Sequence, residues 1–318
     1  MTEPASKRGY LVFWGALLLL GTGLALSSGP IRALLAEAMR TVSLASVLAT
    51  VPGQIAASVL CAAALWALKP GPGLWGCLKS RLLRDAGDNL LVFLPGLGEV
   101  IGARALVLAG GKTRAAVTAS ALDKLAETLA QVPYIALAAW VLFAGWQSNM
   151  ADRLPGWQVG LGLLAVLALI GGGLLWARHG TSRWAIWLRA EWAHLREEYH
   201  RQKSGLPLCT ALHFLAWVMG GVQIWMAASA LGLELSLYEA IAIESAAYAG
   251  RAILFFVPAG LVTQEAGIVA AGLLFGLTPA ESLAIALVLR LRDLLFGVVL
   301  LAWPIHEWRH GRRIKAGG

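Results

Sequence analysis

The chain has 318 residues, of which 58% are hydrophobic and only 14% charged, and its formal net charge is +8. Soluble domains carry about 25% charged residues, so this composition excludes an ordinary soluble enzyme and indicates an all-α polytopic membrane protein. The basic residues lie in short segments between apolar runs, which indicates membrane topology and not nucleic-acid binding.

Six apolar segments are long enough to cross a bilayer as helices. They lie at 10–28, 42–68, 115–145, 157–177, 207–231 and 279–303. The first follows a charged start, as in a signal peptide, but its apolar run is extended and further spans follow it, so we expect a retained helix. We therefore predict one integral membrane domain over 1–318 with about six transmembrane helices.

Two further apolar segments are interrupted by proline and glycine. The first, "NLLVFLPGLGEVIGARALVLAGG", covers 89–111, and the second, "ILFFVPAGLVTQEAG", covers 253–267. Inside hydrocarbon, backbone groups freed by such residues cost several kcal/mol each unless they pack in protein or line a polar cavity. We predict two re-entrant helical hairpins beside a binding site, with their shape set by Pro95, Gly96, Gly98, Pro258, Gly260 and Gly267.

Loop charges give the expected topology. Basic residues cluster before the first span, after the second span, in 178–203 and at the end of the chain, and they include Lys7, Arg8, Lys69, Lys79, Arg81, Arg84, Arg309, Arg312, Arg313 and Lys315. The segments 29–41, 146–156 and 232–240 hold few. With six crossings, both termini then lie in the cytoplasm of a bacterial inner membrane, and the two hairpins enter from opposite faces.

The segment 183–202 has the pattern of an amphipathic helix. Apolar and aromatic residues recur at steps of three and four, namely Trp184, Leu188, Trp192, Leu195 and Tyr199. Arginines occupy much of the other side, so we predict a helix lying on the anionic inner leaflet. The alternative is an ordinary cytoplasmic loop helix.

A shift of 166 residues aligns the two halves of the chain. It places Glu99 on Glu265, Lys124 on Arg290 and Glu127 on Asp293, and it also aligns Gly110 with Gly276. We interpret 80–145 and 240–303 as two repeats, although a chance alignment of apolar sequence is the alternative. Opposed hairpins in an inverted repeat are typical of transporters whose broken helices form the substrate site.

Ionisable residues recur inside the predicted membrane segments, where they require partners or water. Asp123, Lys124 and Glu127 lie within about one turn, Arg290 is three residues before Asp293 with Arg292 between them, and Glu244 is seven residues before Arg251. Pairing at helical spacing is one interpretation, in which these charges only hold the helices together.

The other interpretation is a polar groove for a lipid headgroup. Arg104, Lys124, Arg251, Arg290 or Arg292 would then meet a phosphate, for which the guanidinium fork is well suited. Glu99 and Glu265 would meet an amine or hold the arginines, and Asn89 would contact the headgroup or cap the first hairpin. The candidates are therefore Asn89, Glu99, Arg104, Asp123, Lys124, Glu127, Glu244, Arg251, Glu265, Arg290, Arg292 and Asp293.

Motifs of soluble enzymes are missing from the sequence, which has no GxSxG, HExxH or Walker loop. Cys61, Cys77 and Cys209 form no CxxC pair and suggest no Cys/His cluster, so the sequence predicts neither a metal site nor a cofactor. His213 lies inside the start of a span, where we expect a hydrogen-bonded contact between helices.

The two interrupted segments resemble the lysylphosphatidylglycerol synthase transmembrane-region family. The first motif of that family falls on Asn89, Pro95, Gly96, Gly98 and Glu99, with Leu97 where a basic residue is frequent. The second falls on Pro258, Gly260 and Glu265, with Ala259 and Val262 in place of glycines. Within the family the chain looks most like the stand-alone membrane proteins associated with hopanoid biosynthesis.

This resemblance implies a lipid as partner and lipid movement between leaflets as activity, in hopanoid or aminoacyl-phospholipid metabolism. The soluble transferase domain of the bifunctional relatives is not found after Trp303, so lysyl transfer is not expected of this chain. Two alternatives remain open: an accessory subunit of a lipid-synthesis complex, and a membrane-embedded lipid transferase with Glu99 or Glu265 as base.

Overall fold

The computed structural model describes residues 28–90, 96–149, 196–197, 199–253, 261–305 and 307, and every regular element among them is helical. The α-helices are α2 (Gly29–Thr41), α3 (Leu44–Ala49), α4 (Val51–Ala67), α5 (Leu74–Leu90), α6 (Leu97–Leu108), α7 (Thr113–Asn149), α10 (Leu206–Ala230), α11 (Leu237–Ile253), α12 (Leu261–Leu274) and α13 (Pro279–Gly297). Two 3-10 helices are η1 (Lys203–Gly205) and η2 (Val298–Ala302). The predicted all-α class is confirmed.

Several predictions fall outside the described residues. These are the segment 157–177, nearly all of 10–28, most of the amphipathic helix at 183–202, and the positions Pro95, Pro258 and Gly260. The side chain of Arg251 and both chain ends also lie outside the described part.

Two helical segments of the described chain are long and apolar enough to span a bilayer, namely Leu44–Ala67 and Tyr199–Ala230. They correspond to the spans predicted at 42–68 and 207–231. The helices α7 and α13 occupy the spans predicted at 115–145 and 279–303, but both carry several charges. At 37 residues α7 is about 55 Å long and exceeds the thickness of a hydrocarbon core. The count of six spans stays a prediction.

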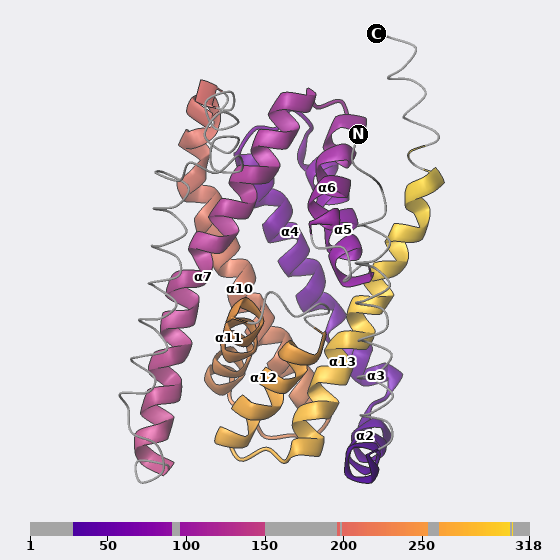
Figure 1. The fold of residues 1–318 in the computed structure, drawn as a ribbon, viewed down its shortest axis with the longest axis vertical. Coiled ribbons are helices and arrows are strands. Elements are labelled where there is room, and N and C mark those ends of the chain that lie inside the picture. The colour runs from indigo at the N-terminus through magenta and orange to yellow at the C-terminus, as the bar shows by residue number, and fades with distance from the viewer. Residues whose placement is uncertain are drawn as a thin grey trace, which may run out of the picture.

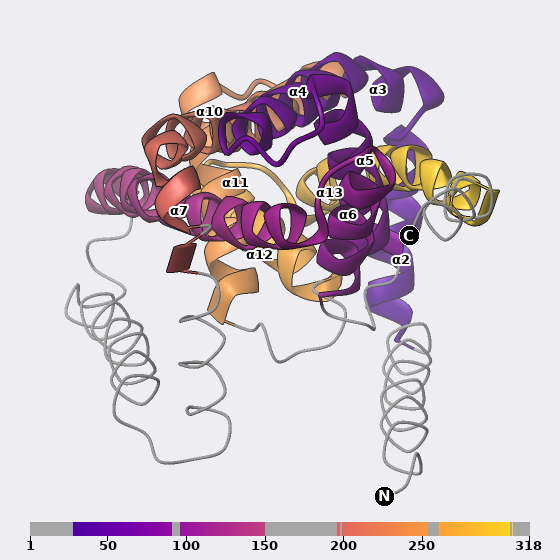
Figure 2. The same cartoon turned by 90° about the horizontal axis from the view of Figure 1, so that it is seen from above.

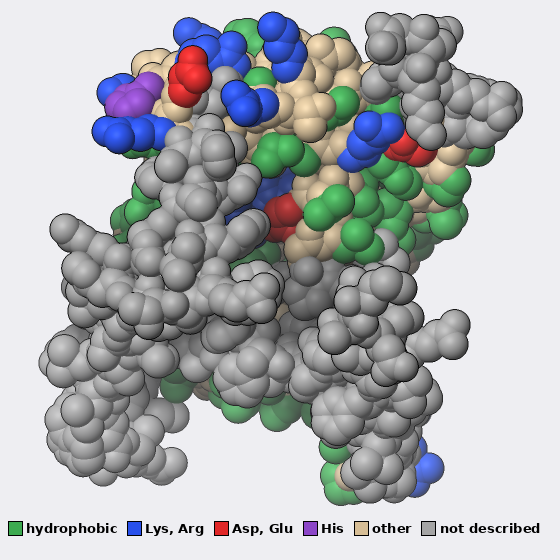
Figure 3. All heavy atoms as spheres, turned by 45° about the horizontal axis from the view of Figure 1, so that its top comes forward, with side chains coloured by type: hydrophobic (Ala, Val, Ile, Leu, Met, Phe, Trp, Pro, Cys, Tyr) green, Lys and Arg blue, Asp and Glu red, His purple; other side chains and the backbone are tan. Residues whose placement is uncertain are grey.

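The described surface is rich in exposed apolar side chains. Ile55 of α4, Leu129 and Val132 of α7, and Leu295 of α13 are each about half exposed or more. Figure 3 shows hydrophobic side chains over much of the described surface, with Lys and Arg side chains gathered at the upper end. Contiguous exposed apolar surface on a monomer indicates contact with a membrane or a partner.

Each interrupted segment contains the end of one helix and all or part of the next, and the two helices pack on each other. The first helix of the first pair, α5, lies almost wholly before the predicted segment 89–111. The α5–α6 pair lies toward one end of the long axis and the α11–α12 pair toward the other (Figure 1). A turn with Gly110 at a φ of +99° leads from α6 into α7, and a turn with Gly276 at +82° leads from α12 into α13. These are the two glycines that the 166-residue shift aligns, and glycine is the residue that adopts positive φ without strain.

The helices form two layers, which Figure 2 shows end-on. One layer contains α4 packed against α10, and the other contains α7, α13 and the two helix pairs. Within the second layer α6 packs on α7 and α12 packs on α13, while α5 also contacts α13 and α11 also contacts α7. The two halves of the chain are therefore interleaved, and each helix pair contacts the long helix of the other half.

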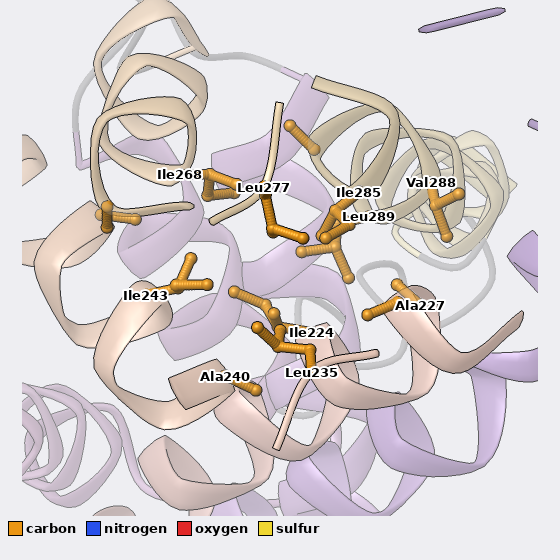
Figure 4. Packing of buried hydrophobic residues seen from close by; sticks show 14 of the residues in the cluster. Ile224, Ala227, Leu235, Ala240, Ile243, Ile268, Leu277, Ile285, Val288 and Leu289 are labelled. Carbon is orange, nitrogen blue, oxygen red and sulfur yellow. The ribbon is translucent and has the colours of Figure 1, made fainter. Parts of the chain in front are cut away.

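Two apolar cores hold these layers together. The larger joins α10, α11, α12 and α13 through Ile224, Ile243, Ile268 and Ile285, all of them 0–1% exposed (Figure 4). The second joins α4 through α7 with α10 and includes many alanines. Small residues allow helices to approach closely, so these alanines bring α4, α7 and α10 together.

Candidate functional site

A polar cavity of about 440 Å³ lies among seven helices of the described chain. Its wall includes residues of α4, α5, α7, α10, α11, α12 and α13, so both helix pairs and both layers contribute to it. Of the sequence-predicted candidates, the cavity is lined by Asn89, Lys124, Glu127, Glu244, Arg292 and Asp293.

Arg84 of α5 is the centre of the ion network on one side of this cavity. Its Nη1 lies 2.8 Å from Oδ2 of Asp123, and its Nη2 lies 2.6 Å from Oε2 of Glu127. Both carboxylates come from α7, and all three side chains are at most 10% exposed. Such charge-assisted bonds to one guanidinium fix α5 against α7.

Arg81, one turn before Arg84, extends the network. Its Nε lies 2.9 Å from Asp85, and its Nη2 lies 3.2 Å from Oε1 of Glu127. Counting Arg81 and Arg84 as loop charges was wrong, because both side chains are buried in the cavity wall. The signal was present in "RLLRDAGDNL", where each arginine precedes an aspartate by four residues, as helical pairing requires.

Lys124 joins the first helix pair to α7 at the edge of the network. Its Nζ lies 3.4 Å from Oε1 of Glu99 on α6 and 3.3 Å from Oε2 of Glu127. Glu99 also lies 3.6 Å from Arg84. The Lys124 side chain is 50% exposed, which makes it the most accessible of the cavity's basic groups in the described chain.

Asp123 also connects α7 to α10. Its Oδ1 lies 2.8 Å from Nε2 of His213 and 3.8 Å from Sγ of Cys209, and all three residues are buried. His213 therefore makes the helix-to-helix hydrogen bond expected of it. Cys209 was not expected here, although Cys-x-x-x-His in a helix places both side chains on one face.

The opposite side of the cavity is formed by the second half of the chain. Arg292 lies 2.7 Å from Asp293 and donates a hydrogen bond to Gln223 of α10. Arg290 does not pair with Asp293, as its helical spacing suggested, but with Glu265 of α12, at 2.5 Å. The contact across to α12 is available because α12 packs directly on α13.

The remaining candidates differ in position. Glu244 is 5% exposed and faces Gly220, where an added Cβ would lie 2.8 Å from its Oε1. Asn89 lines the cavity from the last turn of α5. Arg104 was expected in the groove, but it pairs with Glu307 at 2.6 Å, is 38% exposed and does not line the cavity.

Gly98 and Gly267 bring the helices of each pair into close contact. A Cβ on Gly98 would lie 2.6 Å from the carbonyl oxygen of Arg84, and one on Gly267 would lie 2.6 Å from the Cα of Ala247. Gly96, at a φ of +82°, begins α6 in the left-handed region. These close approaches keep Glu99 and Glu265 near the long helices that hold their basic partners.

The α5–α7 network carries more carboxylates than bases. Five acidic groups, Asp85, Asp88, Glu99, Asp123 and Glu127, surround three basic ones, Arg81, Arg84 and Lys124. This network therefore has two more acidic side chains than basic ones. Such an imbalance in a poorly solvated site favours a bound cation or a cationic group.

A helical bundle with many exposed apolar side chains and a charged cavity among its helices is the class of structure expected of a membrane protein with a polar site. A family model for the lysylphosphatidylglycerol synthase TM region matches residues 86–300, which is more than half of the chain, so the protein belongs to this family. The match covers α6 through α13 but only the last five residues of α5, and it places the chain in membrane lipid metabolism. No curated protein and no solved structure shows a significant match.

Proposed function

We propose that this protein binds a lipid, or a lipid intermediate, and moves it between the leaflets of the bacterial inner membrane in hopanoid or aminoacyl-phospholipid metabolism. The observation that supports this function is the polar cavity of about 440 Å³, lined by arginine, lysine and carboxylate groups, in a bundle with many exposed apolar side chains. Charges at this depth are costly unless they serve a polar ligand or pathway.

The size of the cavity favours a headgroup as its occupant. Ligand pockets of about 300–1,000 Å³ hold small molecules, so this cavity accommodates a headgroup but not the acyl or polycyclic tails as well. The tails would remain in the bilayer beside the bundle. In this arrangement Lys124 and Arg292 would meet a phosphate, and the excess carboxylates would meet an amine.

An inverted repeat, with helix pairs re-entering from opposite faces, would supply the movement. Two observations support it. Lys124 pairs with Glu99 in the first half, and Arg290 pairs with Glu265 in the second. The 166-residue shift aligns these two ion pairs with each other. The turns after both pairs also contain glycines of positive φ at equivalent positions. Rocking of one half against the other would then expose the cavity to each leaflet in turn.

Reconstitution into vesicles tests the transport function. Purified protein is expected to speed the exchange of a labelled lipid between leaflets, with phosphatidylglycerol, its lysyl ester and a hopanoid with a polar side chain as the probes. Lys124→Gln, which removes an accessible charge from the cavity wall, is expected to slow exchange about tenfold or more. Arg104→Gln is the matched control, because it removes a half-exposed charge outside the cavity.

The alternatives give different results in the same vesicles. If wild-type protein leaves every probe in its original leaflet but co-purifies with lipid-synthesis enzymes, the protein is an accessory subunit and the transport proposal is wrong. If a labelled headgroup is transferred in detergent, where no second leaflet exists, the protein is a lipid transferase.

A further inference from the structure

The cluster of Asp123, Cys209 and His213 combines three different metal-binding side chains at one buried point. One ligand atom from each residue (a carboxylate oxygen, the thiol sulfur and an imidazole nitrogen) lies within 4.8 Å of the other two. We propose that these three residues bind a divalent cation of the zinc type, between α7 and α10.

The distances in the cluster are close to those of a tetrahedral zinc site. Zinc binds nitrogen and oxygen at about 2.0–2.2 Å and sulfur at about 2.3 Å, so adjacent ligands in a tetrahedron are about 3.3–3.7 Å apart. The observed separations are 2.8 Å between His213 and Asp123 and 3.8 Å between Cys209 and Asp123. Binding of a cation would therefore require the His213–Asp123 distance to lengthen slightly and the Cys209–Asp123 distance to shorten slightly.

The scaffold already holds the ligands in orientation. Cys209 and His213 are four residues apart on α10, so they present their ligand atoms on one face. Asp123 presents Oδ1 to them while Arg84 holds its other oxygen, Oδ2, at 2.8 Å. A hydrogen bond to the second carboxylate oxygen is the kind of outer contact that orients a metal ligand.

The local charge also favours a cation. The α5–α7 network has two more carboxylates than bases, and Asp123 belongs to it. A divalent cation would offset this excess, while the Cys209 thiol would release one proton to solvent as it becomes a thiolate ligand. A thiolate with an imidazole selects zinc over magnesium or calcium, which prefer oxygen ligands.

Access to the site is provided by the cavity. Cys209 and Asp123 are buried, but His213 forms part of the cavity wall, and so does Cys61 of α4. With three protein ligands the site would be of the open type, and a cation there would tie α7 to α10 directly.

Cobalt titration tests the proposal, because Co²⁺ replaces zinc and reports its ligands by absorption. The full chain, purified in detergent and freed of metal by a chelator, is expected to show a thiolate-to-cobalt band in the near ultraviolet together with strong tetrahedral d–d bands. Cys209→Ser is expected to abolish the thiolate band, and His213→Gln is expected to weaken Co²⁺ binding by at least about tenfold.

Cys77→Ser is the matched control, because Cys77 is equally buried but does not belong to the cluster. It is expected to leave the cobalt spectrum unchanged. A wild-type protein without a thiolate band, or a band that persists in Cys209→Ser, would overturn the proposal. If Cys209→Ser does not fold, the wild type still decides the question: Zn²⁺ must protect Cys209 from alkylation, as read by mass spectrometry, and equal alkylation with and without Zn²⁺ would refute the site.

Discussion

At the scale of single residues, the main feature is a buried arginine shared by two carboxylates. Arg84 is 7% exposed and contacts Asp123 and Glu127, while neighbouring Arg81 contacts Glu127 as well. Removing one partner of a buried pair leaves uncompensated charge and costs about 3–5 kcal/mol. The network is therefore strongly coupled, and its members should respond to substitution together.

Arg84→Gln is expected to destabilise the protein by about 3 kcal/mol, because Asp123 and Glu127 would lose their closest cation. The double variant Arg84→Gln, Glu127→Gln should recover part of this loss, since it also removes one of the carboxylates left without its cation. Thermal unfolding in detergent, followed by helical circular dichroism, measures both effects.

Arg104→Gln is the control for Arg84→Gln. Arg104 pairs with Glu307, but both side chains are more than one third exposed, and such pairs contribute about 0–1 kcal/mol. Equal losses of stability in the two arginine variants would show that the buried network is not coupled as described.

Sequence spacing predicted some of these contacts and not others. The Lys124–Glu127 contact was expected because residues three apart meet on any helix. The Arg84–Asp123 contact joins positions 39 residues apart, and nothing in the spacing specifies which helix α5 will face. For the same reason Arg290 was expected to pair along α13, whereas it pairs across to α12.

At the scale of elements, close approach of two helices decides where the charged groups lie. The α5 and α6 helices touch at Gly98, where a Cβ would lie 2.6 Å from the Arg84 carbonyl oxygen and would also collide with the Asp88 carboxylate. A backbone atom cannot move aside as a flexible side chain can. The glycine thus keeps α6, and with it Glu99, next to the network.

Gly98→Ala is expected to destabilise the protein by about 1–3 kcal/mol, because the added methyl group forces α5 and α6 apart. Gly73→Ala is the matched control: Gly73 lies just before α5, and a Cβ there meets nothing within 4 Å. The control should change stability by less than about 0.5 kcal/mol. Unfolding midpoints of the two variants in the same detergent provide the comparison, and similar midpoints would contradict the close packing.

The Arg290–Glu265 ion pair joins α13 to α12, and a double-mutant cycle would measure its coupling energy. Its side chains are 20% and 22% exposed, so the pair is better shielded from water than Arg104–Glu307 at 38% and 37%. We expect a coupling energy of about 1 kcal/mol or more for Arg290–Glu265, within the usual range for contacting residues. The cycle on Arg104–Glu307 should give less, since exposed pairs are screened.

The measurement uses unfolding free energies of each single variant and each double variant with neutral glutamine at both positions. A larger coupling energy for Arg104–Glu307 than for Arg290–Glu265 would mean that the Arg290–Glu265 contact does not hold α12 to α13. In that case the proposed equivalence with Lys124–Glu99 would lose its energetic support.

At the scale of the whole molecule, hydrophobicity and interruption patterns predicted the helical class, the spans at 42–68 and 207–231, and the interruptions between α5 and α6 and between α11 and α12. They did not predict that α5 is the first helix of its pair. Pro and Gly inside an apolar run predict the end of a helix, because they disrupt backbone hydrogen bonding at their own position, whatever the tertiary structure around them. Charge counting along the sequence was less successful. It assigned Arg81 and Arg84 to a loop, since a helix that hides its charges inside a protein and a solvated loop have similar composition.

The positions of the α6–α7 turn and the α10–α11 turn predict on which side of the membrane each turn lies. The turn between α6 and α7 lies at one end of the long axis and the turn between α10 and α11 lies at the other (Figure 1). If the long axis crosses the bilayer, reporter tags inserted at Lys112 and at Gly232 must report opposite sides, with Lys112 in the cytoplasm. Both positions are exposed, so a tag there should not disturb packing. Tags that report the same side would mean that one helix pair passes through the membrane, and the two halves could then not enclose the cavity from opposing leaflets.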